Sequence, residues 1–163
     1  MKTKSCIVLM TIFSLTIGNT KNSSNISVKF NSPEKFTDFK SDVSSSKSNR
    51  SKLMKELENL IIKSSGSYVN SSEKMEIIIT NVDMKGSYFF GSSNLFRVVK
   101  DTDRSSLEFS YKVTDMNGFI SKQGEINLTN RNLQSKSRSR IKNRHSHFTY
   151  EMTMYDTWLK KNF

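Results

Sequence analysis

The alternation of hydrophobic and polar residues predicts strands early in the chain and near its middle. Residues 26–30 alternate, which is typical of a strand with one buried face. Residues 75–84 contain three consecutive isoleucines, which favours a central strand covered on both faces. Aromatic residues follow, and residues 95–99 predict one further short strand.

A β-hairpin is predicted in the second half of the chain. Residues 107–113 alternate strictly, and residues 119–128 alternate again after a polar turn. The turn contains Asn117 and Gly118, a pair that supplies the positive φ angles of tight hairpins.

Two segments carry the spacing of amphipathic helices. Residues 51–64 have Ser51 as a possible N-cap and one apolar stripe, and residues 147–161 have a broad apolar face. The first stripe comprises Leu53, Leu57, Leu60 and Ile61, and the second face comprises Phe148, Met152, Tyr155, Trp158 and Leu159.

The order of these elements predicts an α+β fold. We expect a single-domain two-layer sandwich, with a mostly antiparallel sheet of four to five strands and two helices packed on it, most simply on one face. The domain would span residues 26–163, behind a flexible linker at 19–25. Polar composition predicts mobile loops near 40–51 and 131–146.

The first eighteen residues have the pattern of a secretory signal peptide. Lys2 and Lys4 precede an uncharged apolar run at residues 6–17, and Gly18 follows as a small residue. The run is too short to span a bilayer as a mature helix. We therefore expect residues 1–18 to direct export to the periplasm or the medium, with an N-terminal core element as the alternative.

Removal of that segment changes the composition in two ways. The one cysteine, Cys6, is lost, so the mature chain could form neither a disulfide nor a cysteine-based site. The net charge of +11 falls by the two lysines to 11 − 2 = +9. A basic chain of this kind suits a polyanion, although composition alone favours a soluble basic surface.

A basic tract lies between the hairpin and the last helix. No acid occurs between Glu125 and Glu151. The basic residues there that could neutralise phosphates are Arg131, Lys136, Arg138, Arg140, Lys142 and Arg144. The tract predicts contact with anionic lipid, glycan or nucleic acid, and the alternative is a solvated loop.

The histidines do not predict a metal site. His145 and His147 could approach one ion, but Glu151 is the only local acid, and structural metal sites take more ligands. We therefore expect no metal and no cofactor, with the histidines at the exposed start of the last helix.

A possible ligand or partner surface is predicted at the end of the strand at 75–84. There Asp83 precedes Tyr88, Phe89 and Phe90, and a carboxylate beside aromatic rings can line a pocket. The alternative is an aromatic core with turn-capping aspartates.

Further acids near Asp83 keep an enzyme open as a weaker alternative. Asp101, Asp103 and Glu108 could supply a second carboxylate, although no spacing joins two of them. The chain has no phosphate loop, nucleophile elbow or HExxH motif, so we favour a protein that is not an enzyme.

Several segments, taken in order, resemble one bacterial family of secreted, periplasmic proteins, catalogued as domain of unknown function three thousand and sixteen. They are residues 30–38, 79–86, 111–118 with Gly124 and Glu125, 150–151 and 156–163. Two positions depart from the family pattern. Residues 102–105 replace a proline-rich turn, and Tyr155-Asp156-Thr157-Trp158 replaces an Asp-Asp-Trp ending.

The resemblance implies an envelope location and a single domain, and it brings no catalytic residues. We therefore expect a non-enzymatic secreted or periplasmic accessory or interaction module whose partner is another envelope protein. Polyanion binding through residues 131–144 is the alternative, and an enzyme using carboxylates near Asp83 is the weaker one.

Overall fold

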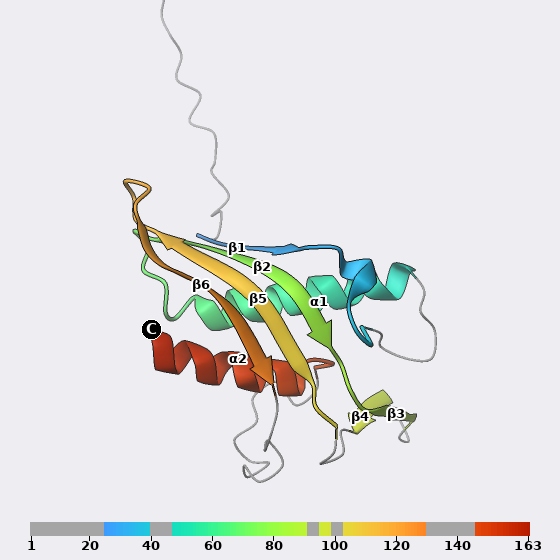
Figure 1. The fold of residues 1–163 in the computed structure, drawn as a ribbon. Helices are drawn as coiled ribbons and strands as arrows, with labels where there is room; N and C mark the ends of the chain where they lie inside the picture. Colours follow the sequence, from blue (N-terminus) through green and yellow to red (C-terminus); the bar gives the residue numbers. More distant parts are fainter. Residues whose placement is uncertain (1–24, 40–46, 91–94, 99–102, 130–145) are drawn as a thin grey trace, which may run out of the picture.

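The computed structural model describes residues 25–39, 47–90, 95–98, 103–129 and 146–163 (Figure 1). The predicted export signal at 1–18, nearly all of the linker at 19–25, and residues 40–46 of the first predicted loop lie outside the described residues. So does almost all of the second predicted loop, including the basic tract.

Four strands form the main sheet, in the spatial order β1-β2-β5-β6. Their bounds are β1 Ile26–Phe30, β2 Lys74–Asp83, β5 Ser106–Thr114 and β6 Ile120–Thr129. Only β1 and β2 run parallel, and the other two pairings are antiparallel. The sheet is therefore mostly antiparallel, as the sequence predicted.

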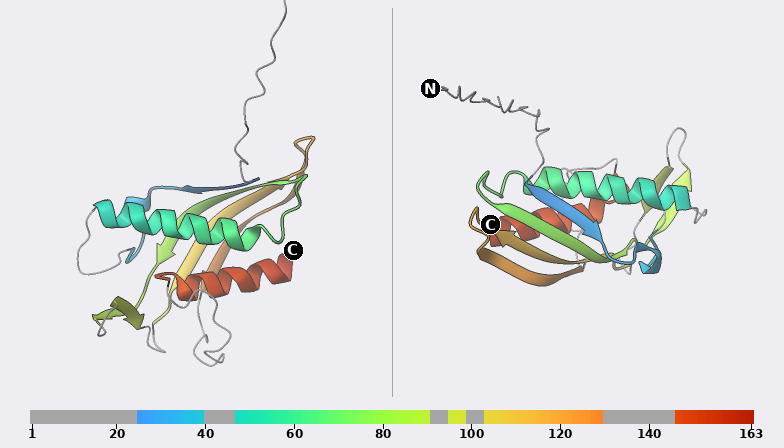
Figure 2. Two further views of the ribbon diagram at one scale, coloured as in Figure 1. Left: turned by 180° about the vertical axis from the view of Figure 1, so that it is seen from behind. Right: turned by 90° about the horizontal axis from the view of Figure 1, so that it is seen from above.

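Both long helices lie on the same face of this sheet (Figure 2). Helix α1 spans Lys47–Ser65 between β1 and β2, and α2 spans Thr149–Asn162 after β6. A short 3₁₀ turn, η1, occupies Pro33–Lys35. The predicted two-layer α+β sandwich is thus confirmed, and its second face has no helix over it among the described residues.

The core lies between the sheet and the two helices. Alternate residues of β2 and β5 point into it, and the predicted helical stripes meet them. The fully or almost fully buried side chains include Leu53, Leu57, Ile61, Met75, Ile77, Ile79, Leu107, Phe109, Val113, Phe148, Met152, Tyr155 and Leu159.

An aromatic cluster joins β5 to α2 inside this core. The ring of Phe109 lies 5.5 Å from that of Tyr155 and 5.0 Å from that of Trp158, measured between centroids. Tyr111 packs edge-on against Trp158 at 5.0 Å, and Phe163 completes the cluster at 5.7 Å from Trp158. Edge-to-face rings at these distances stabilise the fold beyond the area they bury.

Two expectations about β2 and α1 need correction. The sheet has one face without a helix, so Ile78 is only half-buried there, and β2 is central without being covered on both faces. Helix α1 begins at Lys47, so Ser51 is not its N-cap and residues 47–51 are not loop. Its first turn is polar, and hydrophobic spacing therefore could not mark it.

The predicted hairpin is confirmed, with small changes at its turn. Gly118 adopts a positive φ of 84°, whereas Asn117 does not take a positive φ, and β6 begins at Ile120, one residue after Phe119. The carboxylate of Asp115 accepts hydrogen bonds from the backbone N–H groups of Asn117 and Phe119 at 2.8 and 2.9 Å. The turn is therefore held by its own side chain.

The chain between β2 and β5 forms a second, two-stranded sheet. Strands β3 Ser87–Phe90 and β4 Leu95–Val98 pair antiparallel with each other and with no strand of the main sheet. The sequence predicted only the second of these strands, because Tyr88, Phe89 and Phe90 are three consecutive aromatic residues and show no alternation.

Replacing Phe109 with alanine should lower the free energy of unfolding by about 3–5 kcal/mol, because it empties the centre of the aromatic cluster. Phe119→Ala is the matched control, since that ring is 72% exposed and its loss should change stability by no more than about 0.5 kcal/mol. Urea unfolding measures both. Equal losses in the two variants would contradict the placement of this core.

Candidate functional site

Asp83 lies at the end of β2 in a partly buried position. Its side chain is 16% exposed, and Lys85 Nζ lies 3.8 Å from Asp83 Oδ1. The same ammonium group donates a hydrogen bond to Asp38 at 2.8 Å. Burial raises the pKa of Asp83, although the positive charge of Lys85 opposes the shift. Lys85 thus stands between two carboxylates.

The carboxylates named from the sequence together with Asp83 lie in different places. Glu108 accepts a hydrogen bond from Asn127 at 3.2 Å, on the side of the sheet without helices. Asp103 is close enough to contribute, after Asp38 and Asp83, to the raised pKa of Lys85. Asp101 lies outside the described residues.

The aromatic residues of the same prediction follow Asp83 along the chain. Tyr88, Phe89 and Phe90 form β3, where they pair with Arg97, Phe96 and Leu95 of β4. Their side chains are outside the described part of the structure, so a ligand surface there stays a prediction.

A buried ion pair that the sequence analysis missed lies beside this region. Arg97 Nη2 donates to both carboxylate oxygens of Glu151 at 2.9 and 2.8 Å, and the two side chains are 4% and 0% exposed. Burial raises the pKa of Glu151 despite the favourable charge of Arg97. The pair fixes the small sheet to the first turn of α2.

The sequence does contain a signal for this pair. Glu151 falls on the same helical face as Phe148, Met152 and Tyr155, and Arg97 interrupts an apolar run. A charged residue inside an apolar stripe indicates a buried partner. The two residues are 54 positions apart, so the identity of the partner could not be read from spacing.

Several buried polar atoms around the pair lack a hydrogen-bond partner among the described residues. They are Arg97 Nε and Nη1, Asp83 Oδ1 and Ser105 Oγ. Arg97 also lowers the pKa of Asp83, although less than Lys85 does. These groups form one polar cluster at the end of the sheet, with Glu151 enclosed and already paired.

His147 lies at the start of α2 and contacts α1. Its Nδ1 is 2.7 Å from Glu56 Oε2, and its backbone N–H donates to Glu56 Oε1 at 3.0 Å. Burial would raise the pKa of Glu56, but hydrogen bonds from His147 and Ser146 outweigh it, so the pKa is lowered. His147 is thus tied to an acid of the other helix, whereas His145 lies outside the described residues.

No group of three or more histidine, cysteine or acidic side chains converges on a common point within the described segments. No described helix is both long enough and apolar enough to cross a membrane.

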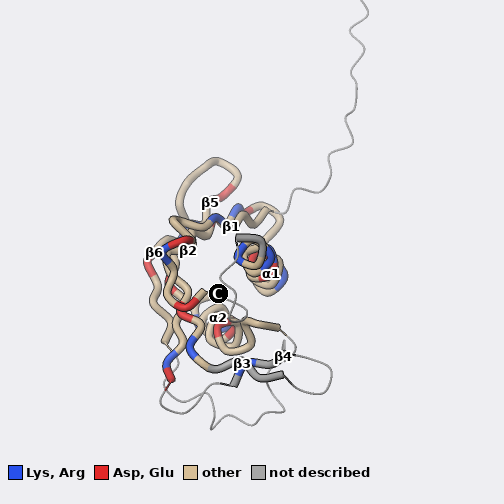
Figure 3. The backbone as a smooth tube through the Cα atoms, turned by 90° about the vertical axis from the view of Figure 1, so that its right-hand side faces the viewer, with Lys and Arg blue, Asp and Glu red and all other residues tan. Residues whose placement is uncertain are grey.

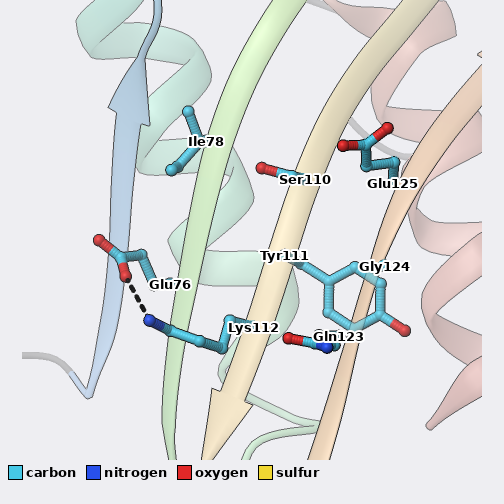
Figure 4. Close-up of a pocket in the computed structure, with 8 residues that line it drawn as sticks. All are labelled: Glu76, Ile78, Ser110, Tyr111, Lys112, Gln123, Gly124 and Glu125. Carbon is cyan, nitrogen blue, oxygen red and sulfur yellow. Dashed lines mark ion pairs between the residues drawn. The ribbon is translucent and has the colours of Figure 1, made fainter.

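The side of the sheet away from the helices carries a shallow hollow over β2, β5 and β6 (Figure 4). We call it the open-face hollow. It encloses about 480 Å³ and is lined by Glu76, Ile78, Ser110, Tyr111, Lys112, Gln123, Gly124 and Glu125. Its lining mixes hydroxyl, amide and charged groups with one aliphatic side chain, a composition suited to hydrogen bonding with a partner.

The charges along one side of the hollow are held by ion pairs. Glu76 lies between Lys29 of β1 and Lys112 of β5, with Lys112 Nζ 3.4 Å from Glu76 Oε2. The hydrogen bond and charge of Lys29 lower the pKa of Glu76, with a smaller effect from Lys112. Acidic and basic residues both occur along the sheet (Figure 3). The open-face hollow therefore presents a fixed pattern of both signs.

Gly124 allows Tyr111 to lie across β6 at the edge of the hollow. Any other residue at position 124 would place its Cβ 3.2 Å from Tyr111 Cε1. The ring also packs on Trp158, so it has little room to move away. A glycine is therefore required here by the approach of the ring.

The predicted polyanion contacts are not placed by the structure. Arg131, Lys136, Arg138, Arg140, Lys142 and Arg144 all lie outside the described residues. Their role stays a prediction from the charge of the tract.

Comparison with known proteins gives one family match. The family model described as "Protein of unknown function (DUF3016)" matches residues 24–161, which covers every described strand and all of the described helices except the last residue of α2. No curated protein and no solved structure matches the chain.

Removing Arg97 alone should destabilise the protein by about 3–5 kcal/mol, because Arg97→Ala leaves the Glu151 carboxylate buried without its partner. The double variant Arg97→Met with Glu151→Met should recover much of that loss, since it leaves no buried charge. Urea unfolding of both, with each single methionine variant, gives the coupling energy. A double variant no more stable than Arg97→Ala would argue against a buried pair.

Asp83→Asn should raise the free energy of unfolding at pH 7, because the native fold disfavours the ionised form of Asp83. The raised pKa means that the folded protein binds a proton more readily than the unfolded chain. The stability contributed by this proton is present below the ordinary aspartate pKa of 3.8 and is lost as the pH rises through the folded-state value. The advantage of the variant should therefore disappear in acid, as urea unfolding between pH 3 and pH 7 would measure, and an advantage that persisted at pH 3 would contradict it.

Proposed function

The chain belongs to this family of proteins of unknown function, and we propose that it is a non-enzymatic accessory module of the bacterial envelope. Its partner would be another envelope protein, bound at the open-face hollow. The observation that carries this proposal is a sheet with helices on one face and an ordered, mixed polar surface on the other. A sheet face of this kind can receive a partner without rearrangement of the core.

The chemistry of the hollow suggests what part of the partner would bind. Ser110 and Gln123 offer hydrogen-bond donors and acceptors, and Glu125 is an exposed acid that favours a basic or amide group. Ile78 supplies a small apolar contact at the other side of the hollow. A protein segment with a polar side chain next to an apolar one would match this arrangement.

Buried groups near Asp83 support a binding role over catalysis. Glu151 is enclosed and paired with Arg97, and Asp83 forms an ion pair with Lys85. A general acid or base must reach the proton that it moves. In this arrangement the Arg97–Glu151 pair acts in stability, and the exposed hollow is the better candidate for recognition.

Export is the second part of the proposal. The basic start, the apolar run and Gly18 support a signal peptide at residues 1–18, and an accessory role in the envelope depends on it. Polyanion binding through residues 131–144 is the alternative function, and the basic residues of that tract support it.

Crosslinking in a bacterial host tests the proposed function. The full chain should yield a processed envelope form that crosslinks reproducibly to one protein. Ser110→Trp should reduce that crosslink at least about tenfold, because a bulky ring would fill the hollow and the buried contacts there would be lost. Asn59→Trp, on the exposed surface of α1, is the matched control and should leave the crosslink unchanged.

Three results would contradict the proposal. An unprocessed cytoplasmic form would refute export. An equal crosslink in both tryptophan variants would refute the hollow as the binding site. Recovery of anionic glycan or nucleic acid without a protein would favour the basic tract instead.

A further inference from the structure

The exposed hydrophobic residues of the described chain gather at one place. Met116, Phe119 and Ile120 are 82%, 72% and 53% exposed, and they are the large hydrophobic side chains that stand out as exposed among the described residues. All three lie within five consecutive positions at the turn between β5 and β6. We call these three residues the hairpin tip.

The hairpin tip is rigidly built and points away from the core. Asp115 accepts two backbone hydrogen bonds inside the turn, its own N–H donates to the carbonyl of Phe119 at 2.9 Å, and Gly118 supplies the positive φ. The turn projects past the ends of both helices (Figures 1 and 2). The turn geometry thus uses the backbone of Phe119 but neither the Met116 nor the Phe119 side chain, and both side chains are largely exposed.

Lysines surround the tip at the same end of the molecule. Lys74 pairs in register with Thr114 and Lys122 with Val113, so both flank the turn. Lys122 Nζ donates to the carbonyl of Asn162 at 2.7 Å, which places the end of α2, with exposed Lys160 and Lys161, beside β6.

The preceding chain joins the domain at this end too. β1 starts at Ile26, in register with Met75 at the start of β2. Asn25 donates side-chain hydrogen bonds to the carbonyls of Asn70 and Glu73 at 2.8 and 2.9 Å. The first described residue, Asn25, therefore lies on the side of the domain that carries the hairpin tip.

We propose that the hairpin tip inserts into the surface of an anionic lipid bilayer, with the surrounding lysines on the lipid phosphates. Exposed apolar side chains next to basic residues are the combination that interfacial membrane binding requires, since burial of the former adds to attraction by the latter. The interaction is separate from partner binding at the open-face hollow, because the tip lies at the end of the strands and the hollow on their face.

Environment-sensitive fluorescence of the full chain tests this. A nitrobenzoxadiazole label is placed at the tip through Met116→Cys in a Cys6→Ser background. A second protein carries the label at Glu34→Cys in η1, which is exposed at the opposite end of the sheet. Vesicles of phosphatidylcholine with phosphatidylglycerol should shift the emission to the blue at position 116 and leave position 34 unchanged. Vesicles of phosphatidylcholine alone should give a much smaller shift at 116.

Two sets of variants separate the apolar and the charged contributions. Phe119→Ser with Ile120→Ser should raise the vesicle concentration that gives half of the emission shift at position 116 by about tenfold or more. Lys74→Gln, Lys160→Gln and Lys161→Gln together should weaken it by about tenfold or more. The same change at Lys35, Lys52 and Lys55, which removes equal charge away from the tip, should have much less effect.

The outcomes decide the proposal without reference to the partner. No shift at 116, equal shifts at 116 and 34, or equal shifts in neutral and anionic vesicles would overturn it. A shift at 116 that grows with protein concentration without vesicles would assign the tip to a second copy of the chain and also overturn it. A crosslinked protein partner lost on Ser110→Trp would leave this result unaffected.

Discussion

Packing of aromatic rings between β5 and α2 is the interaction on which the rest of the structure depends. Phe109 contacts the rings of both Tyr155 and Trp158, so the last helix is fixed to the centre of the sheet. Tyr155 also hydrogen-bonds Ser65 at the end of α1, with 2.6 Å between the hydroxyl oxygens, and burial raises its pKa. One helix thus holds the sheet and the other helix in place together.

The position of α2 in turn determines what happens at the end of the sheet. Its first turn places Glu151 against Arg97 of β4, and His147, two residues before the helix, contacts Glu56 of α1. A buried ion pair adds little net stability but is costly to break. The Arg97–Glu151 pair therefore fixes the position of the small sheet. The stability of the aromatic core offsets the free-energy cost of burying the two charges.

The predictable part of this fold is the part governed by local periodicity. Ile77, Ile79, Leu53 and Leu57 alternate or recur as strands and helices require, and they are buried as expected. The helical start at Lys47 and the uncovered side of Ile78 depend on what packs nearby, which one segment cannot indicate.

The candidate site was less predictable for the same reason. Asp83 was found because a carboxylate at the end of a strand stands out in a sequence. The second carboxylate near Lys85 is Asp38, 47 positions away, a separation that gives no local pattern. Arg97 and Glu151 were both visible as charges within apolar runs. Their pairing needed the tertiary structure, because any residue of opposite charge could have been the partner of Arg97 or of Glu151.

The two proposed surfaces fit one orientation of the domain. The hairpin tip lies at one end of the main sheet, so a bilayer at the tip would lie across the ends of the strands. The open face would then stand upright on the membrane, with the hollow at Ser110 facing sideways into the aqueous space. A partner could reach it there without competing with lipid. The opposite end, which holds Arg97, Glu151 and the small sheet, would be farthest from the bilayer. The buried ion pair would there be enclosed by protein and would not contact lipid.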